Sequence, residues 1–368
     1  MYVLMNFSFF PFSFFFLNME SSVKNRKEVC IIYHFPCYDG TYGAINAYLY
    51  YKNFTNDKYN ITFKPLRNIF PIFSIIDKNY DKIISLDLAL KDEDMNFLTD
   101  KKNDNISIVL FDHHFSWYER YTKDYIPKII GRKKLKIFFD EKSKKSACGL
   151  SFDYFKEKAL SKKDINKELV SKIFNDNYKI INDYIEDSDT GNFSLKFIHE
   201  FKSGLSNDYP LHLTDFTSQP KNIKKFIEIC PSYLTKIGEK SLSKLKRQAK
   251  SILKQNNIYV VELKGGYKFL MCITEKKYVR NYACPLLGKI SKKRGYLPVG
   301  AFVYEYVNNL YKFSMRASDD TCDVSKIANV YGGGGHKAAA AFTMDYDGID
   351  NLILKTINIK KDIDRTQF

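Results

Sequence analysis

The sequence has no Cys-x-x-Cys motif, and its seven cysteines are an odd number for a chain of 368 residues. A zinc ribbon and a closed framework of disulfides are therefore both disfavoured. We expect a reducing compartment, in which most of the cysteines are small buried side chains.

Long apolar runs are absent after residues 1–17, so no later segment is predicted to cross a membrane and no stable membrane partner is expected. Residues 1–17 are apolar but short for a span, contain Pro11, and lack a clear secretory signal pattern. Three interpretations stay open for them: a misassigned start with Met19 as the true first residue, which we favour, a signal-like anchor, or a genuine tail. We expect a cytoplasmic protein, and this segment leaves organelle or signal-like targeting open.

Acidic residues are scarce relative to basic ones, with 42 Asp and Glu against 58 Lys and Arg and a net charge of +16. Residues 231–300 alone hold 16 basic and three acidic side chains. Such a segment favours a polyanionic partner, although a solvated basic helix face would give the same count. The hydrophobic content of 45% indicates a folded globular chain, and its length predicts two domains.

Short apolar runs alternate with helical patterns in the first half of the chain. This alternation predicts an α/β fold, with a mainly parallel sheet and helices on both of its faces. The expected strands are Val29–Tyr33, Ile61–Phe63, Ile83–Leu86, Ile106–Phe111 and Leu135–Phe139, and the expected helices are Thr41–Tyr51 and Lys91–Thr99.

The second half predicts a smaller α+β unit. Residues 146–190 are expected to be helical, 203–222 a loop, and Pro231–Gln255 a long helix, followed by strands at Ile258–Leu263, Tyr267–Thr274 and Val299–Met315. The predicted division is an N-terminal extension (1–28), a catalytic domain (29–200), a linker with a connecting helix (201–256), a substrate-binding domain (257–345) and a tail (346–368).

Polar clusters follow the predicted strands. Asp112-His113-His114 comes directly after the strand that ends at Phe111, and Asp87 follows the strand that ends at Leu86. Because the carboxyl ends of parallel strands share one sheet edge, these side chains are expected to gather there. Carboxylates and imidazoles together suit Mn²⁺, Fe²⁺ or Zn²⁺, although Asp87 alone could equally be a helix cap.

Three further segments also carry polar residues after a predicted strand or at a predicted turn. His34, Cys37 and Asp39 follow the first strand, and Asp189 lies in an Asp-Thr-Gly turn. Near the C-terminus, four glycines precede His336, where backbone N–H groups could approach a phosphate. Each segment also has a purely structural reading as a turn or a cap.

Taken in order, these motifs resemble the DHH phosphoesterase family with a C-terminal DHH-associated domain of the first type, the nanoRNase, pAp phosphatase and RecJ-like group. The resemblance spans about residues 29–345. It implies that Asp39 and Asp87 bind metal, with Asp87 bridging two ions. It further implies that His113 binds metal, that Asp112 orients it, and that His114 lies near the substrate phosphate.

The resemblance also assigns Asp189 to the metal site and Arg316 and His336, with Gly333–Gly335, to substrate binding. On this basis we predict Asp87, Asp112, His113 and His114 as catalytic. The chain departs from the family pattern at Cys37, which stands where the family has an aspartate, with His34 nearby. Cys37 and His34 are therefore additional candidate ligands, and a thiolate would favour softer metals. A milder departure is Ala341, where the family often has glycine.

The resulting expectation is a metal-dependent phosphoesterase that hydrolyses a nucleotide or a short single-stranded oligonucleotide in an interdomain cleft. Two divalent ions are implied, with Mn²⁺ expected first and Mg²⁺, Fe²⁺ or Zn²⁺ left open. The alternative is a non-catalytic nucleic-acid-binding protein with a degraded metal site. A pyrophosphatase is disfavoured, because family pyrophosphatases carry a different C-terminal domain. The sequence specifies no oligomeric state.

Overall fold

A computed structural model of the chain describes residues 26–114, 119–140, 144–211, 221–307 and 309–368. These residues form two compact units. The first runs to Asn192 and also includes the segment that ends at Glu228, whereas the second begins at Phe193 and continues from Ile229 to Phe368. The expectations for residues 1–25 lie outside the described residues.

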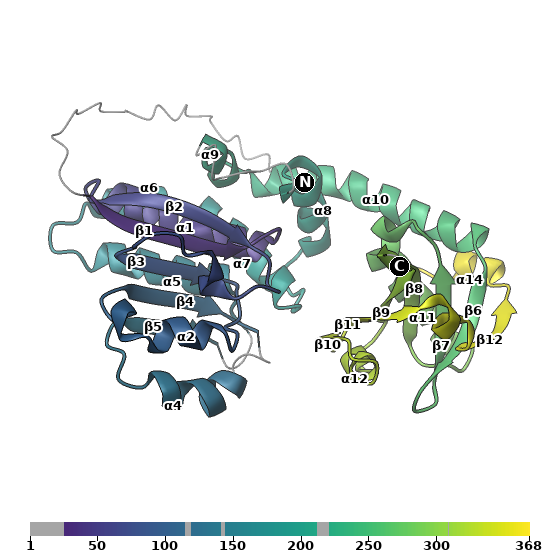
Figure 1. The fold of residues 1–368 in the computed structure, drawn as a ribbon. Coiled ribbons are helices and arrows are strands. Elements are labelled where there is room, and N and C mark those ends of the chain that lie inside the picture. The colour runs from purple at the N-terminus through teal and green to yellow at the C-terminus, as the bar shows by residue number, and fades with distance from the viewer. Residues whose placement is uncertain (1–25, 115–118, 141–143, 212–220, 308) are drawn as a thin grey trace, which may run out of the picture. The chain divides into compact units, whose positions relative to one another are not determined.

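The first unit is built on a parallel sheet of five strands with the order β2-β1-β3-β4-β5 (Figure 1). The strands are β1 (Lys27–His34), β2 (Tyr59–Leu66), β3 (Lys82–Leu86), β4 (Ser107–Asp112) and β5 (Leu135–Phe139). All five coincide with predicted apolar runs, and the first begins two residues before the predicted domain start. Buried β-branched runs favour this arrangement, because both faces of a parallel sheet are covered.

Helices cover both faces of this sheet. One face packs against α1 (Tyr38–Phe54) and α5 (Ala147–Leu160), and α7 (Asp176–Asp189) packs against these helices. The other face forms a core with the short helices η1 (Ile72–Ile75), α2 (Asp94–Thr99) and α4 (Ile126–Ile129). The remaining helices of this unit are η2 (Lys101–Asn103), η3 (Tyr121–Tyr125), α6 (Lys167–Ile173) and α9 (Lys221–Ile227). The predicted α/β class is confirmed.

The second unit begins with two helices that pack tightly on each other, α8 (Ile198–Asp208) and α10 (Pro231–Gln255). A Cβ atom at Gly204 would lie 2.1 Å from the Leu234 carbonyl oxygen, and one at Gly238 would lie 1.7 Å from the Glu200 carbonyl oxygen. Glycine therefore permits the close approach of the two backbones. The prediction of a loop from residue 203 is wrong for 203–208, which are helical, while residues 212–220 lie outside the described ranges.

The sheet of the second unit has seven strands in the order β10-β11-β9-β8-β7-β6-β12 (Figure 1). Its strands are β6 (Ile258–Leu263), β7 (Tyr267–Ile273), β8 (Val299–Val307), β9 (Leu310–Ala317), β10 (Gly334–His336), β11 (Ala339–Asp345) and β12 (Ile353–Ile357). Only β7 and β8 pair in parallel, and α11 (Arg280–Lys293) connects them. The other helices are η5 (Lys277–Val279), α12 (Val324–Asn329), α13 (Tyr346–Asp350) and α14 (Lys360–Arg365).

The limits of the units differ from the predicted domain limits at several points, beginning with the end of the first stretch of unit one at Asn192 instead of residue 200. The helix Pro231–Gln255, predicted as a connecting helix, belongs to the second unit, because its apolar side packs into the core that contains Ile258 and Leu286. The predicted tail 346–368 is also part of this unit, since β12 pairs with β6 and Ile363 is buried. Within the described ranges, no helix has the length and apolar character that crossing a bilayer requires.

Candidate metal centre

The polar side chains predicted from the strand ends do meet at the carboxyl edge of the first sheet. His34 is the last residue of β1, Asp87 follows β3, and Asp112 is the last residue of β4. Asp39 lies in the first turn of α1, and Asp189 is the last residue of α7. Five separate segments therefore bring carboxylates and imidazoles to one edge.

The centre of this group consists of Asp39, Asp87, His113 and Asp189, each of which offers a ligand atom within 4.8 Å of the others. His113 Nε2 lies 3.0 Å from Asp189 Oδ2, 3.5 Å from Asp87 Oδ1 and 3.8 Å from Asp39 Oδ2. Asp39 and Asp87 are almost completely buried. Three carboxylates this close are stabilised by a bound cation, by a protonated histidine or by uptake of a proton, because isolated buried anions are strongly destabilised.

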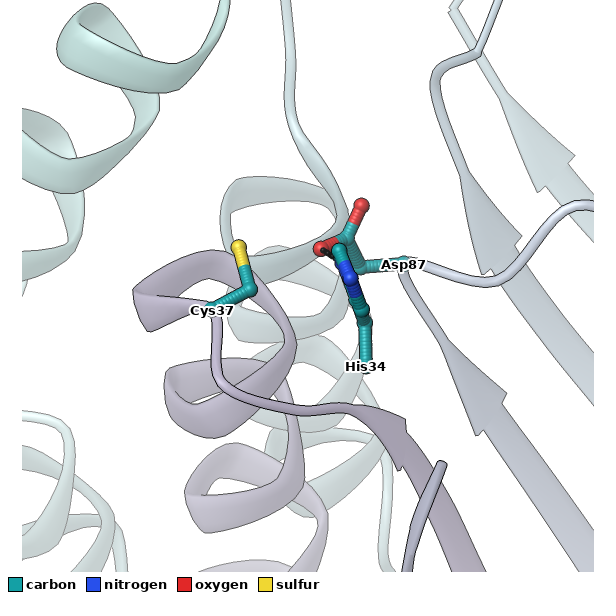
Figure 2. Close-up of side chains that lie close together, drawn as sticks. All are labelled: His34, Cys37 and Asp87. Atoms are coloured by element: carbon teal, nitrogen blue, oxygen red, sulfur yellow. Dashed lines mark hydrogen bonds and ion pairs between the residues drawn. The ribbon is translucent and has the colours of Figure 1, made fainter. Parts of the chain in front are cut away.

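Asp87 also belongs to two further groups of candidate ligands, one with His34 and Cys37 and one with His113 and His114. Figure 2 shows the first of these groups, with the three side chains turned toward one another from β1, the start of α1 and the end of β3. His34 Nδ1 lies 2.9 Å from Asp87 Oδ2, and the Cys37 thiol donates to Asp189 Oδ1 at 4.0 Å. Asp87 is thus shared by all three groups.

The start of α1 is held against the end of β1 by close backbone packing. A Cβ atom at Gly40 would lie 2.5 Å from the carbonyl oxygen of His34, so only glycine fits there. This approach keeps Cys37 and Asp39, on either side of the helix start, beside His34.

Asp39 is fixed by the first turn of α5. Its Oδ1 accepts hydrogen bonds from Ser146 Oγ at 2.5 Å and from the Cys148 N–H at 2.8 Å, and its Oδ2 accepts from the Ala147 N–H at 2.9 Å. The carboxylate therefore satisfies two N–H groups at a helix N-terminus that would otherwise lack partners. Burial, followed by the charges of Asp87 and Asp189, raises the pKa of Asp39 to about 7.

The pKa of Asp87 is shifted in the opposite direction from that of Asp39. Burial acts to raise its pKa, but hydrogen bonds from His113 and His34 outweigh burial and lower the pKa below its usual range. Its backbone has a φ of 60° and its N–H donates to the Phe111 carbonyl oxygen at 2.9 Å. This left-handed conformation is uncommon outside glycine and is typical of functional sites.

The two histidines of the DHH triplet face different partners. Burial alone would lower the pKa of both imidazoles, but the neighbouring carboxylates raise it by a larger amount. Asp189 and Asp87 raise the pKa of His113 to about 12, and Asp112 raises that of His114 to about 9. Without a cation, protonated His113 thus supplies the positive charge that the three carboxylates need.

Asp112 contacts the second histidine of the triplet. Its Oδ1 accepts a hydrogen bond from His114 Nδ1 at 2.7 Å, which orients His114. Its Oδ2 is buried and, among the described residues, has no hydrogen-bond partner. Asn68, which the sequence analysis missed, lies with its Nδ2 3.4 Å from His114 Nε2. Its position just after β2, at the same sheet edge, was the available signal.

The donor set fits a divalent cation. Asp39, Asp87, Asp189 and His113 offer three carboxylates and one imidazole, a set that suits Mn²⁺, Fe²⁺ or Zn²⁺. Cys37, a candidate ligand outside this set, fits less well, because burial and the charges of the nearby aspartates raise its thiol pKa well above the usual value. Without a bound metal, Cys37 is therefore a neutral thiol.

The predicted substrate-binding residues lie in the second unit. Arg316, on β9, donates through Nη1 to the Met315 carbonyl oxygen at 2.8 Å and through Nη2 to Asn281 Oδ1 at 3.0 Å. Gly333–Gly335 and His336 form an ordered edge instead of an open loop, because Gly334, Gly335 and His336 make up β10 and pair with β11. A Cβ atom at Gly333 would lie 2.3 Å from the Ala341 carbonyl oxygen.

Comparison with known proteins gives one family match, the DHHA1 domain, at residues 266–360. A curated relative, an uncharacterized protein of the Acanthamoeba polyphaga mimivirus, is 23% identical over 351 residues, which cover 91% of this chain and 71% of that protein. The family match confirms the resemblance noted in the sequence, because it identifies a DHHA1 domain in the second unit.

Solved structures of similar proteins include two that cover most of the chain. A pGpG-specific phosphodiesterase of Vibrio cholerae is 11% identical, with a TM-score of 0.45, and the alignment covers 89% of this chain and 96% of that one. An exopolyphosphatase-related protein of Bacteroides fragilis is 14% identical, with a TM-score of 0.43 and coverages of 92% and 90%.

Proposed function

We propose that this chain is a metal-dependent phosphoesterase that hydrolyses a nucleotide or a short oligonucleotide. One observation carries the proposal: Asp39, Asp87, His113 and Asp189 converge from four segments with their ligand atoms within 4.8 Å of one another. The DHHA1 domain in the second unit supports it, because the DHH phosphoesterases that the sequence resembles carry this domain.

Two divalent ions are proposed, with Asp87 shared between them. Support comes from the overlap of the ligand groups, since Asp87 occurs with Asp39, His113 and Asp189 and again with His34 and Cys37. Ions bound there would lower the pKa of a water molecule and neutralise the charge on phosphoryl oxygens. Mn²⁺ is proposed first, because the group Asp39, Asp87, His113 and Asp189 offers three carboxylates and one imidazole.

Other side chains of the same edge would position the reacting groups. Ser146 and the start of α5 fix the Asp39 carboxylate, which keeps one oxygen directed at His113. His114, oriented by Asp112 and contacted by Asn68, is part-buried and is proposed to contact the substrate phosphate. Such oriented partners of ligands commonly set metal affinity and activity.

The alternative function is nucleic-acid binding without catalysis. Cys37 favours it, because this neutral thiol stands where a carboxylate is expected and would weaken one ion site. The phosphoesterase proposal is stronger than this alternative, because three carboxylates and one imidazole lie close together in the group Asp39, Asp87, His113 and Asp189.

The experiment combines metal content with turnover. The purified protein is loaded with Mn²⁺, its bound metal is measured, and hydrolysis is assayed on short RNA, short DNA, pAp and cyclic dinucleotides. Bound Mn²⁺ and Mn²⁺-dependent release of product are expected, both lost in Asp87→Asn. The matched control is Asp183→Asn, an aspartate on α7 that is paired with Lys179. Bound metal without turnover on any substrate would favour the alternative, and an Asp87→Asn variant with full turnover would contradict the proposed site.

A further inference from the structure

A group of lysines lies at the amino edge of the first sheet, at the opposite end of the strands from the metal centre. The lysine group consists of the first residue of β3, the second residue of β5 and two residues at the end of α5 and just past it, namely Lys82, Lys136, Lys158 and Lys162. At roughly 3.3 Å per residue of strand, Lys82 begins β3 about 16 Å from Asp87. The lysine group is therefore separate from the candidate metal ligands.

The sheet and α5 bring these lysines together. The residues that pair with Lys82 and with Lys136 are two positions apart on the intervening strand β4, so both lysines point to the same face of the sheet. Helix α5 covers this face, because its Tyr154 ring packs 4.7 Å from the ring of Phe138 on β5. The last turn of α5, which carries Lys158, thus meets the strand lysines at the edge of the sheet.

Buried tyrosine rings lie beneath the ammonium groups. Lys158 Nζ lies 5.1 Å and Lys162 Nζ lies 5.5 Å from the centre of the Tyr50 ring. Lys82 Nζ lies 6.0 Å from the centre of the Tyr51 ring, and the two tyrosine rings are 5.2 Å apart. Because both tyrosines are buried, a ligand would meet the ammonium groups and would find no open ring face on which a base could stack.

No carboxylate neutralises the lysine group within the described part of the chain, where none of its four members forms an ion pair. Asp81, which precedes Lys82, instead accepts the Glu28 N–H at 2.7 Å. Glu157, which precedes Lys158, forms no ion pair with a described residue either. Burial, followed by the charges of the other three lysines, lowers the pKa of Lys158 to about 8. A bound anion would relieve this repulsion.

We propose that the lysine group binds a compact polyphosphate anion, either an inorganic chain or the phosphate chain of a nucleoside triphosphate, at a site distinct from the metal centre. Four ammonium groups around two adjacent rings match an anion whose charges lie close together. A nucleic-acid strand instead carries its charges one per nucleotide along an extended backbone. Lysine suits phosphate because its ammonium group is a point charge with three donors on a flexible stem.

The first test reads the site through acetylation of Lys158. The full chain, without added metal, is treated briefly with N-hydroxysuccinimidyl acetate at about pH 7, and the acetylation of each lysine is measured by mass spectrometry. Tripolyphosphate is expected to slow acetylation of Lys158 about 10-fold or more, because each unit by which the anion raises the pKa removes about nine-tenths of the neutral amine. Lys156 is the internal reference, since it lies on the same helix but faces another side, over the Phe152 ring, and its rate should not change.

The second test measures tripolyphosphate binding by calorimetric titration of metal-free protein. Lys82→Gln and Lys158→Gln are each expected to weaken binding about 10-fold, the effect of one lost charge-assisted hydrogen bond. The matched control, Lys156→Gln, removes the same charge from the same helix and should keep wild-type affinity. Without the anion, Lys158→Gln should raise Tm, because repulsion within the lysine group decreases. A lower Tm together with unchanged affinity would show that Lys158 only stabilises the end of α5, and would overturn the site.

The source of the polyphosphate is distinguished by comparing ligands at Lys158. Protection by tripolyphosphate equal to that by ATP would identify the phosphate chain alone as the ligand, and stronger protection by ATP would identify a nucleotide. Either result supports the site, with AMP expected to protect weakly. Equal protection by a five-nucleotide RNA would overturn the compact anion in favour of nucleic acid, and no protection by any of these anions would overturn the site. Neither test depends on hydrolysis, so the proposed function can fail while the lysine group is confirmed, or the reverse.

Discussion

The metal centre makes a direct prediction for Asp189→Asn. Asp189 ends α7, and its Oδ2 lies 3.0 Å from His113 Nε2 within the group of candidate ligands. Its side chain is 31% exposed, so the amide should fit in its place. In EDTA we expect a change in unfolding free energy within about 1 kcal/mol, because the lost ion pair with His113 is offset by reduced repulsion from Asp39 and Asp87.

The effect should instead appear when metal is added. At free Mn²⁺ 100 times its dissociation constant, binding stabilises the folded protein by about 2.7 kcal/mol. Loss of a ligand should weaken binding at least as much as loss of a ligand's partner, for which 10- to 100-fold is typical. With about 100-fold weaker binding, the gain at the same Mn²⁺ falls to about 0.4 kcal/mol. The difference, about 2.3 kcal/mol, corresponds to about 5–9 °C in Tm for a unit of this size.

The assay is thermal unfolding with and without Mn²⁺, followed by a tyrosine signal. Asp183→Asn serves as the control, because Asp183 lies on the same helix and pairs only on the surface with Lys179. Wild type and control should show the full Mn²⁺-dependent rise in Tm. If Asp189→Asn shows the same rise, Asp189 is not a ligand and the proposed centre is wrong.

Three further predictions concern the surroundings of the centre and the second unit. Ser146→Ala should weaken Mn²⁺ binding by about 10- to 100-fold in calorimetric titration, because Asp39 loses the hydroxyl that orients it; Ser161→Ala, at the other end of α5, should not. Cys37→Asp should raise Mn²⁺-supported turnover and reduce any preference for Zn²⁺, and unchanged metal preference would show that the thiol only packs. Arg316→Ala should lower kcat/KM with bound metal unchanged, so a loss of Mn²⁺ would contradict its assignment to substrate.

The sheet edge was predictable because its signals are local. Several strands of the first unit are short apolar runs, and polar groups follow them directly, as Asp87 follows β3 and His113 follows β4. Parallel topology then brings these residues together without further information. The long helix was predicted from about Pro231 to Gln255, which agrees with its observed bounds, since its apolar positions repeat with helical spacing.

Features that depend on contacts distant in sequence were not predictable in the same way. Ser146 reaches Asp39 across 107 residues. The helix Ile198–Asp208 is rich in residues that disfavour helices, and packing against α10 stabilises it.

The central claim is that Asp87 is shared by two metal ions, and anomalous diffraction from crystals grown with Mn²⁺ tests it most directly. The account predicts two anomalous peaks at the carboxyl edge of the first sheet, both coordinated by Asp87, one completed by Asp39, His113 and Asp189 and the other by His34 or Cys37. The absence of a peak at Asp87 from crystals that bind Mn²⁺ elsewhere would contradict it.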